Sequence, residues 1–339
     1  MFDTILGALL PAIVTVLFGY LAARTHEFGR KDAPVLNRMV ITFALPLAIF
    51  TDTVGTSRQG LIGDIPMLIV LVVAIVGTYG SVFWVCRSLF HFSVGTSALG
   101  ALAASAPNGP FVGAAVLGSL FGSASDLPVA ISGIVIYVTV APLTVVLLSL
   151  DGGKRSVQPE GRVAVSVGAP AAPAAPTAAT AAAPDRTEVK DKIVAALREP
   201  VVWFPVLGVV IVLSGLRVPA LIDKSLDLLG SSATGVALFT AGVVLAGYRV
   251  MISRAVAFFV LVKNVVQPLL VWVSLVLLSY SKPHLSQAVV MTALPSLVLV
   301  VMLSVQYGVA ETEAASTLLV SMLASLLTIS AFILLTGSA

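Results

Sequence analysis

The sequence predicts an all-α, polytopic membrane protein, and two observations support this fold class. The chain has 339 residues, of which 58% are hydrophobic and only 10% are charged, whereas about 25% of the residues in an ordinary soluble domain are charged. The charges are also clustered, and the uncharged stretches between them approach the roughly 20 apolar residues that span a bilayer. This composition excludes a soluble globular enzyme.

The apolar runs predict ten membrane-spanning helices in two groups of five. A polar segment separates the groups and contains a run of Ala, Pro, Val and Thr that cannot bury a core, so we interpret it as a flexible linker. This divides the chain into a first repeat (1–149), a linker (150–199) and a second repeat (200–339). The predicted spans are 4–23, 34–52, 65–87, 96–121 and 127–149, then 200–216, 228–247, 255–279, 286–306 and 314–336.

The first apolar run is expected to be a retained helix, because its bases follow it (Arg24, Arg30, Lys31), whereas a signal peptide carries bases before its apolar region. The single cysteine, Cys86, excludes disulfides, CxxC redox chemistry and thiolate metal sites. The net charge is only +3, and no basic tract is interleaved with aromatic residues. We therefore expect no nucleic-acid partner.

The distribution of Lys and Arg predicts the orientation in the membrane. With the N-terminus outside, 14 bases fall in inner loops or the linker and 4 in outer loops, and the nineteenth, Lys263, lies within a span. Seven of the 14 belong to the linker, and without them the ratio is still 7 to 4. By the positive-inside rule, both termini are outside and the linker is cytoplasmic.

Cysteine labelling checks this orientation. In a Cys86→Ser background, Ser57→Cys and Ser281→Cys are expected to react with an impermeant thiol reagent added to intact cells, because both positions fall in predicted outer loops. Ser156→Cys, in the linker, should react only after the cells are opened. Labelling of Ser156→Cys in intact cells would reverse the orientation.

Two groups of five spans suggest internal symmetry, and a repeated unit with an odd number of spans must be inverted in the membrane. Short patterns recur in the same order at offsets of 186 to 194 residues. Leu10-Pro11 corresponds to Phe204-Pro205, and Pro107 in the fourth span corresponds to Pro295 in the ninth. We therefore predict two inverted five-helix repeats.

The fourth span is interrupted by Pro107-Asn108-Gly109-Pro110. Each proline removes a backbone hydrogen bond and disfavours helix at the preceding residue, so the helix should break near the middle of the membrane. Pro110 suits the first position of a second half-helix, whose free N–H groups and dipole favour an anion. The break is thus a candidate substrate site, and a packing kink is the alternative.

The ninth span is interrupted by Pro295-Ser296, and the eighth contains Lys263 about 13 Å from its start. Asn264 and Gln267 extend the polar stripe of the eighth span, which should face the protein interior. We assign Lys263, Asn264 and Gln267 to the candidate site. The alternative for Lys263 is a structural role, in which it holds backbone carbonyls or Asp52.

Catalytic and energy-coupling motifs are missing from the sequence. All 16 carboxylates fall in loops or near span ends, which indicates no carboxylate proton relay, and the three histidines lie in loops. No HExxH, GxSxG or Walker-type loop is present. We therefore expect neither an enzyme nor an ATP-driven pump, and no cofactor or metal apart from a coupling cation, H+ or Na+.

Short residue patterns along both halves, but not the linker, resemble those of the bacterial branch of the auxin efflux carrier family, and the second half is similar to its malonate transporter subgroup. They include Leu10-Pro11, Gly19-Tyr20-Leu21, Leu36-Asn37, Phe43 to Pro46, Pro107-Asn108, Leu117 to Gly122, Pro200 to Gly208, Ala237 to Leu245 and Val262 to Pro268.

The resemblance implies ten helices as inverted repeats, in which the broken fourth and ninth helices cross around a carboxylate site. By position, the crossing falls at Pro107, Asn108 and Gly109 and at Pro295 and Ser296. The chain departs from the family at Gly113-Ala114-Ala115, where Gly-x-Pro is common.

The predicted function is secondary transport of a small organic anion, for example a dicarboxylate such as malonate, across a bacterial inner membrane. One alternative is export of an amphipathic acid by uniport. Another is a transporter-like sensor or scaffold whose linker binds a cytoplasmic partner. The sequence does not distinguish a monomer from a homodimer. It also does not determine the exact substrate, the direction of transport or the coupling ion.

Overall fold

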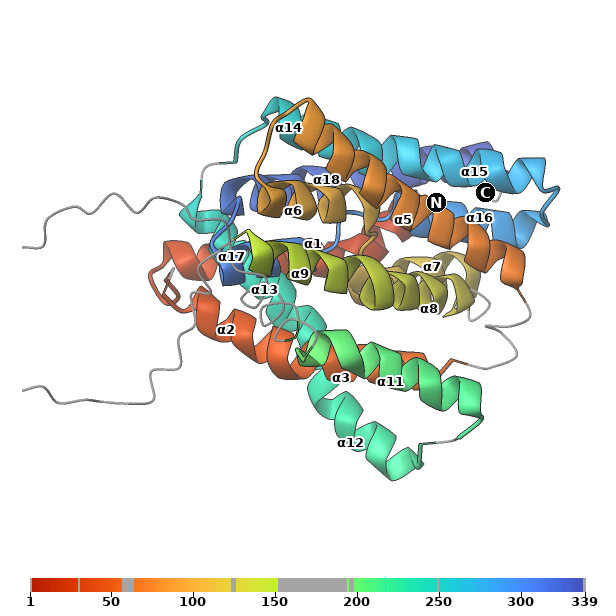
Figure 1. The fold of residues 1–339 in the computed structure, drawn as a ribbon, viewed down its shortest axis with the longest axis horizontal. Helices are drawn as coiled ribbons and strands as arrows, with labels where there is room; N and C mark the ends of the chain where they lie inside the picture. Colours follow the sequence, from red (N-terminus) through yellow and green to blue (C-terminus); the bar gives the residue numbers. More distant parts are fainter. Residues whose placement is uncertain are drawn as a thin grey trace, which may run out of the picture.

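The computed structural model describes residues 2–29, 31–56, 64–122, 126–151, 194, 198–216, 218–248 and 250–337. These residues form helices, and the only β-type pairing among them is one isolated antiparallel bridge. Figure 1 shows most helices lying side by side and roughly parallel to the longest axis of the molecule. Most of the predicted linker, 150–199, lies outside the described residues.

The helices of the first half follow the predicted spans closely. Pro107 interrupts the fourth span as expected, and the remaining spans are continuous helices or end-to-end helical segments. The segments are α1 (Phe2–Arg24), α2 (Ala33–Met39), η1 (Val40–Ala44), α3 (Leu45–Val54), α5 (Ile65–Ser88), α6 (Val94–Ser105), η2 (Gly109–Gly113), α7 (Ala114–Phe121), α8 (Asp126–Val135), η4 (Ile136–Val140) and α9 (Ala141–Leu150).

The second half differs from the prediction mainly at the seventh span, which was expected to begin at residue 228. Helix begins at Ala220 instead. Residues 220–227, which we predicted to be a loop, belong to an amphipathic stretch whose exposed leucines include Leu221 and Leu228. The segments are α11 (Pro200–Ser214), α12 (Ala220–Gly230), α13 (Ser232–Gly247), α14 (Arg254–Leu261), η5 (Val262–Val266), α15 (Gln267–Leu277), α16 (Lys282–Ala293), α17 (Leu299–Tyr307) and α18 (Glu311–Thr336).

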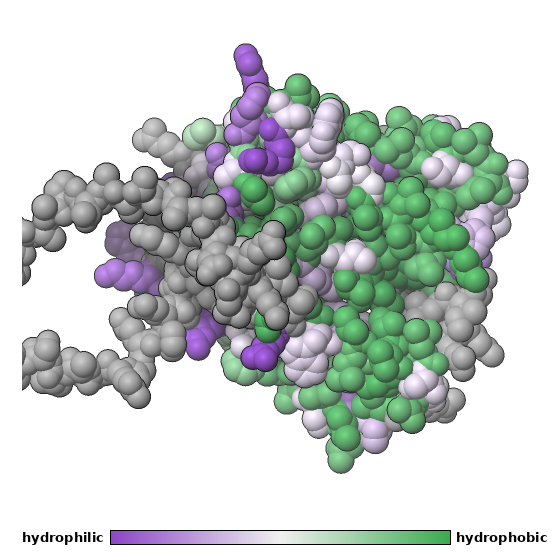
Figure 2. Space-filling view, in the orientation of Figure 1, coloured by the Kyte–Doolittle hydropathy of each residue, from purple (hydrophilic) through white to green (hydrophobic). Residues whose placement is uncertain are grey.

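The surface of the protein is that of a membrane protein. Seven of the described helices, counting end-to-end segments as one, are long and apolar enough to cross a bilayer. Large apolar side chains on them are exposed, for example Phe18, Trp84 and Leu277, and a soluble protein does not tolerate such a surface. Figure 2 shows hydrophobic residues over most of the visible face, with hydrophilic residues concentrated toward one end. The protein is therefore a multi-pass membrane protein.

Prolines shape three of the long helices. The π-helical turns η1, η4 and η5 each end two residues before a proline, namely Pro46, Pro142 and Pro268. A proline has no N–H for the carbonyl four residues earlier, and its ring clashes with that carbonyl. The helix widens locally to avoid the clash, and such turns are frequent at functional sites.

Two pairs of helices approach each other closely at glycines. A Cβ atom at Gly19 of α1 would overlap the carbonyl of Phe239 in α13, and one at Gly242 would overlap the carbonyl of Val16. In the other pair, a Cβ at Gly208 of α11 would lie 3.1 Å from the side chain of Thr53 in α3. Small residues thus allow close helix packing where the bilayer supplies no hydrophobic driving force.

Candidate substrate site

The two interrupted helices meet at their breaks. The N–H of Asn108 donates to the Pro295 carbonyl (2.9 Å), and the N–H of Leu297 donates to the Ala106 carbonyl (3.0 Å). These bonds form the isolated bridge between the two breaks. Irregular backbone is tolerated at membrane depth only where it is buried in protein or lines a cavity. Here each break satisfies part of the backbone of the other.

Asn108 is completely buried and precedes the first turn of η2. Its backbone carbonyl accepts hydrogen bonds from Val112 and Gly113, which gives this turn its π-helical form. The side-chain oxygen lies 3.5 Å from the N–H of Val298, whereas the side-chain Nδ2 has no hydrogen-bond partner among the described residues. Asn108 therefore presents a free amide donor at the break.

The positions next to Asn108 refine the prediction for this half-helix. Gly109 is its first residue and Pro110 its second, rather than Pro110 its first. A Cβ atom at Gly109 would collide with the end of the Met291 side chain and would lie 3.2 Å from Ser132 Oγ. The absence of a side chain at Gly109 thus leaves room for the end of the Met291 side chain, which belongs to the helix before the second break.

Ser296 links the second break to two other helices. Its hydroxyl donates to the Ala103 carbonyl in α6 (2.8 Å), and its N–H donates to Ser321 Oγ in α18 (2.9 Å). Ser321 Oγ in turn donates to Asn264 Oδ1 (2.6 Å), and Asn264 Nδ2 donates to the Ser321 carbonyl (3.1 Å). Asn264 is therefore held against α18 and supports the break indirectly.

Lys263 is fully buried within η5, close to the second break. Its ammonium donates to the Thr292 carbonyl (2.5 Å) and to Gln267 Oε1 (3.1 Å). Gln267 Nε2 donates to the Ser105 carbonyl at the end of α6 (2.6 Å), so this pair connects both breaks. Both acceptors of Lys263 are neutral, and a buried cation without a counter-ion is costly. An anion bound at the crossing would offset that cost.

The structure brings all of the predicted site residues to one place, and it also supports part of the structural alternative for Lys263, because this side chain does hold a backbone carbonyl. We did not predict from the sequence that Ser105, Thr292 and Ser321 contribute to this site. Their only signal was a hydroxyl within an apolar helix, which is common in membrane spans. Ser105 Oγ is buried and, like Asn108 Nδ2, has no partner among the described residues. Pro110 follows Gly109 in η2. The other predicted residues that meet here are Pro107, Asn108, Gly109, Lys263, Asn264, Gln267, Pro295 and Ser296.

Two cavities lie on opposite sides of the crossing. One, of about 40 Å³, contacts α6, which precedes the first break, and α17, which follows the second. The other, of about 210 Å³, contacts α7, which follows the first break, and Figure 1 shows α6 and α7 on either side of the break. The smaller cavity is lined by Phe92, Thr96, Leu99, Gly100, Ala103, Phe259, Val300, Ala310, Glu313, Ala314 and Thr317.

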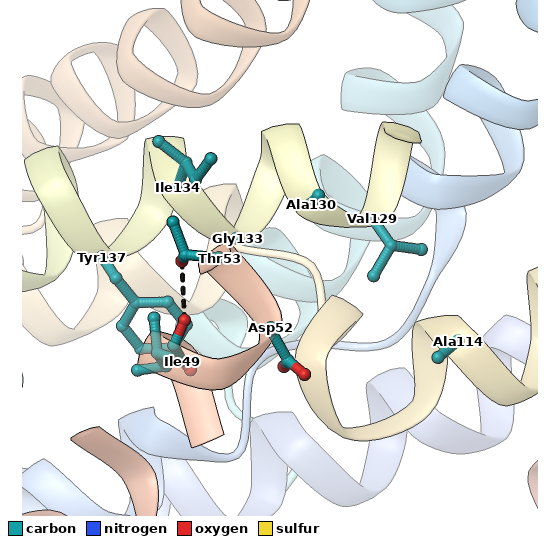
Figure 3. Close-up of a pocket in the computed structure, with 9 residues that line it drawn as sticks. All are labelled: Ile49, Asp52, Thr53, Ala114, Val129, Ala130, Gly133, Ile134 and Tyr137. Carbon is teal, nitrogen blue, oxygen red and sulfur yellow. Dashed lines mark hydrogen bonds between the residues drawn. The ribbon is translucent and has the colours of Figure 1, made fainter. Parts of the chain in front are cut away.

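The larger cavity, called the Asp52 cavity below, lies between α3, α7 and the α8–η4 helix (Figure 3). Asp52 is the one acidic residue in its lining. From the sequence we expected no carboxylate proton relay, because all the carboxylates fall in loops or near span ends, but folding places Asp52 on a cavity. The lining residues are Ile49, Asp52, Thr53, Ala114, Val129, Ala130, Gly133, Ile134 and Tyr137.

Comparison with known proteins identifies the family. A model described as membrane transport protein matches residues 4–333. The chain is 28% identical over 325 residues to the uncharacterized transporter YfdV of Escherichia coli K12, and the alignment covers 95% of both chains. An uncharacterized transporter of Methanothermobacter thermautotrophicus is 33% identical over 115 residues, which cover 34% of this chain and 37% of that protein.

The family match extends over both halves, including both breaks and the helices that contact them. It agrees with the resemblance seen in the residue patterns and with the helical structure. A family of transporters, rather than enzymes, fits a site built from a buried lysine, amides and serines. The chain therefore belongs to the auxin efflux carrier-like family of membrane transport proteins.

Proposed function

We propose that this protein is a secondary transporter of a small organic anion, a carboxylate of the malonate type, and that the anion binds at the crossing of the two breaks. The observation that carries the proposal is the fully buried Lys263, whose two acceptors are neutral. The Asn108 Nδ2, which has no partner among the described residues, supports it as a free donor at the first break. A carboxylate would supply the missing charge and accept from the amide.

The proposal includes ten membrane helices arranged as two inverted repeats, and the contacts across the crossing support this arrangement. The residue numbers of the bridged pair, Pro107 and Ser296, differ by 189. The hydrogen bond from Asn108 to Pro295 has a counterpart with the halves exchanged, the bond from Leu297 to Ala106. Leu297 lies 189 positions after Asn108, and Ala106 lies 189 positions before Pro295. Such an exchange of partners is what a two-fold relation between the halves requires.

The glycine contacts support the same offset. A Cβ atom at Gly19 would overlap Phe239, and one at Gly208 would lie 3.6 Å from the Phe50 side chain. Gly208 lies 189 positions after Gly19, and Phe50 lies 189 positions before Phe239. The first contact joins α1 to α13 and the second joins α11 to α3, so the first helix of each half packs on the second helix of the other. An inverted repeat predicts this reciprocal packing.

Alternating access would open the crossing to each side of the membrane in turn. The two cavities on opposite sides of the breaks are the candidate routes, and both are lined by the half-helices themselves. We further propose the bacterial inner membrane, with both termini outside, from the distribution of bases. Moving one anionic charge inward then costs about 2.3 kcal/mol per 100 mV of inside-negative potential. Uptake would therefore require a co-transported cation, whereas export would not.

A flux assay tests this proposal. In proteoliposomes, radiolabelled oxalate, malonate and succinate are compared with indole-3-acetate, an amphipathic acid. We expect saturable uptake of a small carboxylate, inhibition by its unlabelled form, and much weaker flux of the amphipathic acid, because the crossing is tightly packed and rich in donors. Stronger flux of indole-3-acetate, independent of ion gradients, would favour the uniport alternative. No flux of any acid by a folded protein would favour a sensor or scaffold.

A further inference from the structure

The Asp52 cavity contains a carboxylate with no assigned role. Asp52 lies near the end of α3, and within the described residues its carboxylate makes no hydrogen bond or ion pair. Figure 3 shows Asp52 projecting from α3 into the space between α3 and α7. The side chain is exposed to this space rather than packed in the core. It is therefore available to a ligand that enters the cavity.

Tyr137, on the wall of the cavity opposite Asp52, is a second and independent indication that a ligand binds there. Its side chain is fully buried, and its hydroxyl has no hydrogen-bond partner among the described residues. Buried hydroxyls are normally paired, and an unpaired one requires an explanation. Tyr137 belongs to the π-helical turn η4, and both Tyr137 and Asp52 line the same cavity.

The remaining lining limits the choice of ligand. The Thr53 hydroxyl donates its hydrogen to the Ile49 carbonyl (2.6 Å) and has no second hydrogen to donate to an anion. The other lining residues are Ala, Val, Ile and Gly. Hard metal cations are generally held by about six or more oxygen ligands, whereas the side-chain oxygens of this lining belong to three residues, Asp52, Thr53 and Tyr137. A proton needs only the carboxylate oxygen.

We propose that Asp52 is the proton-binding residue of the transport cycle, and that its carboxylate must be protonated before an organic anion occupies the Asp52 cavity. This rests on the proposed function, namely anion transport through the crossing. The proton adds to a carboxylate oxygen to form the neutral acid and leaves when the carboxylate forms again. An ionised Asp52 repels an incoming anion, and a protonated one does not. One proton is thereby coupled to each entry of anion from this side.

The cavity reaches toward the crossing, which connects this residue to the site. Ala114 lines the cavity five residues after Gly109, on the helix that begins at the first break. On the opposite wall, Gly133 adjoins Ser132, and Ser132 Oγ lies next to Gly109. An anion in this cavity on its way to Asn108 therefore shares the cavity with Asp52.

Few other charged groups face Asp52. On the α8–η4 helix the titratable residues are Asp126, the first residue of α8, and Tyr137, whereas η1, α7 and α11 contain no titratable side chain. The neighbouring helix α12 carries Asp223, Lys224 and Asp227, of which Asp227 is close enough to act on Asp52 electrostatically.

The Asp52 cavity also breaks the symmetry between the halves. A shift of 189 positions replaces Asp52 and Tyr137 by Ala241 and Leu326, so the corresponding place in the second half is apolar. This asymmetry fits a coupling group that is needed once per transport cycle.

The test measures access of an anion to the cavity without any substrate. Full-length Cys86→Ser, Ala114→Cys protein in nanodiscs is labelled with anionic sulfonatoethyl methanethiosulfonate and with its neutral hydroxyethyl analogue. The ratio of the two rates cancels the pH dependence of the thiol itself. We expect this ratio to rise at least 5-fold from pH 8 to pH 5.5, and to be high and independent of pH in Asp52→Asn.

Controls separate the possible outcomes. Glu313→Gln, which changes a carboxylate on the other cavity, should keep the full pH dependence. A ratio independent of pH in the parent protein, or still dependent on pH in Asp52→Asn, would overturn the proposal. The proposal would also be overturned if the ratio changed when Na+ replaced choline at pH 8 and Asp52→Asn abolished that change. The cavity would then bind Na+.

A flux measurement extends the test to coupling. With the radiolabelled acid that the unmodified protein transports, Asp52→Asn should retain exchange of internal for external label but lose accumulation driven by a pH gradient. Loss of exchange in a folded Asp52→Asn protein would contradict the role assigned to Asp52. If the unmodified protein transports no acid, the proposed function fails, and the labelling ratio still reports separately on Asp52.

Discussion

Replacing Asn108 by Ala is expected to abolish saturable transport while leaving the protein folded. The Asn108 amide is buried, and its Nδ2 donor has no partner among the described residues, so its removal breaks no side-chain bond of that nitrogen. A hydrogen bond to a charged group contributes about 1.5 to 3 kcal/mol. Loss of this bond corresponds to a roughly 10- to 150-fold weaker affinity for the anion. Asn108→Asp should be worse, because it adds a negative charge beside the anion.

The measurement is substrate-induced thermal stabilisation of the purified variants, together with flux in proteoliposomes. Asn37→Ala is a matched control, because Asn37 is also a buried amide but its Nδ2 already donates to the Met302 carbonyl (2.8 Å). This control should lower the Tm and keep the apparent affinity. If Asn108→Ala retains the affinity and flux of the unmodified protein, the break is a packing kink and the site lies elsewhere.

Replacing Lys263 by Gln is expected to raise the apparent Kd for the anion at least 10-fold. The amide retains hydrogen bonding to the Thr292 carbonyl but removes the positive charge. Two unit charges 4 Å apart interact by about 4 kcal/mol at an effective dielectric constant of 20, so the charge outweighs the hydrogen bonds. Lys263→Arg should retain partial transport, because it keeps the charge and changes the geometry.

Two controls distinguish binding from folding for Lys263. Lys282→Gln removes an exposed lysine at the start of α16 and should leave binding unchanged. The Lys263→Gln variant is compared with it for membrane expression, Tm and apparent Kd. An unchanged Kd in Lys263→Gln, accompanied by poor expression or a low Tm, would assign Lys263 to a structural role at the Thr292 carbonyl.

The sequence was sufficient for the membrane class and for the positions of the breaks, because both depend on local chemistry. Long uncharged runs need a bilayer wherever they are placed, and the prolines at 107 and 295 remove helical hydrogen bonds regardless of neighbours. Lys263 was recognised as exceptional for a similar reason, since a charge in the middle of an apolar run is costly in any fold. The family was recognisable from residue patterns, and the family match confirmed it.

The partners of these groups were decided only by the tertiary structure. Gln267 bonds to a carbonyl 162 positions away, and Ser296 bonds to one 193 positions away. No local pattern records which helices become neighbours, so the contributions of Ser105 and Ser321 could not be read from the sequence. The environment of Asp52 was also not predictable from the sequence, because its position near the end of a span suggested a side chain exposed to solvent. The arrangement of α3, α7 and α8 around a cavity instead places Asp52 on the cavity wall. The environment of a side chain depends on the surrounding helices and not on depth along its own helix.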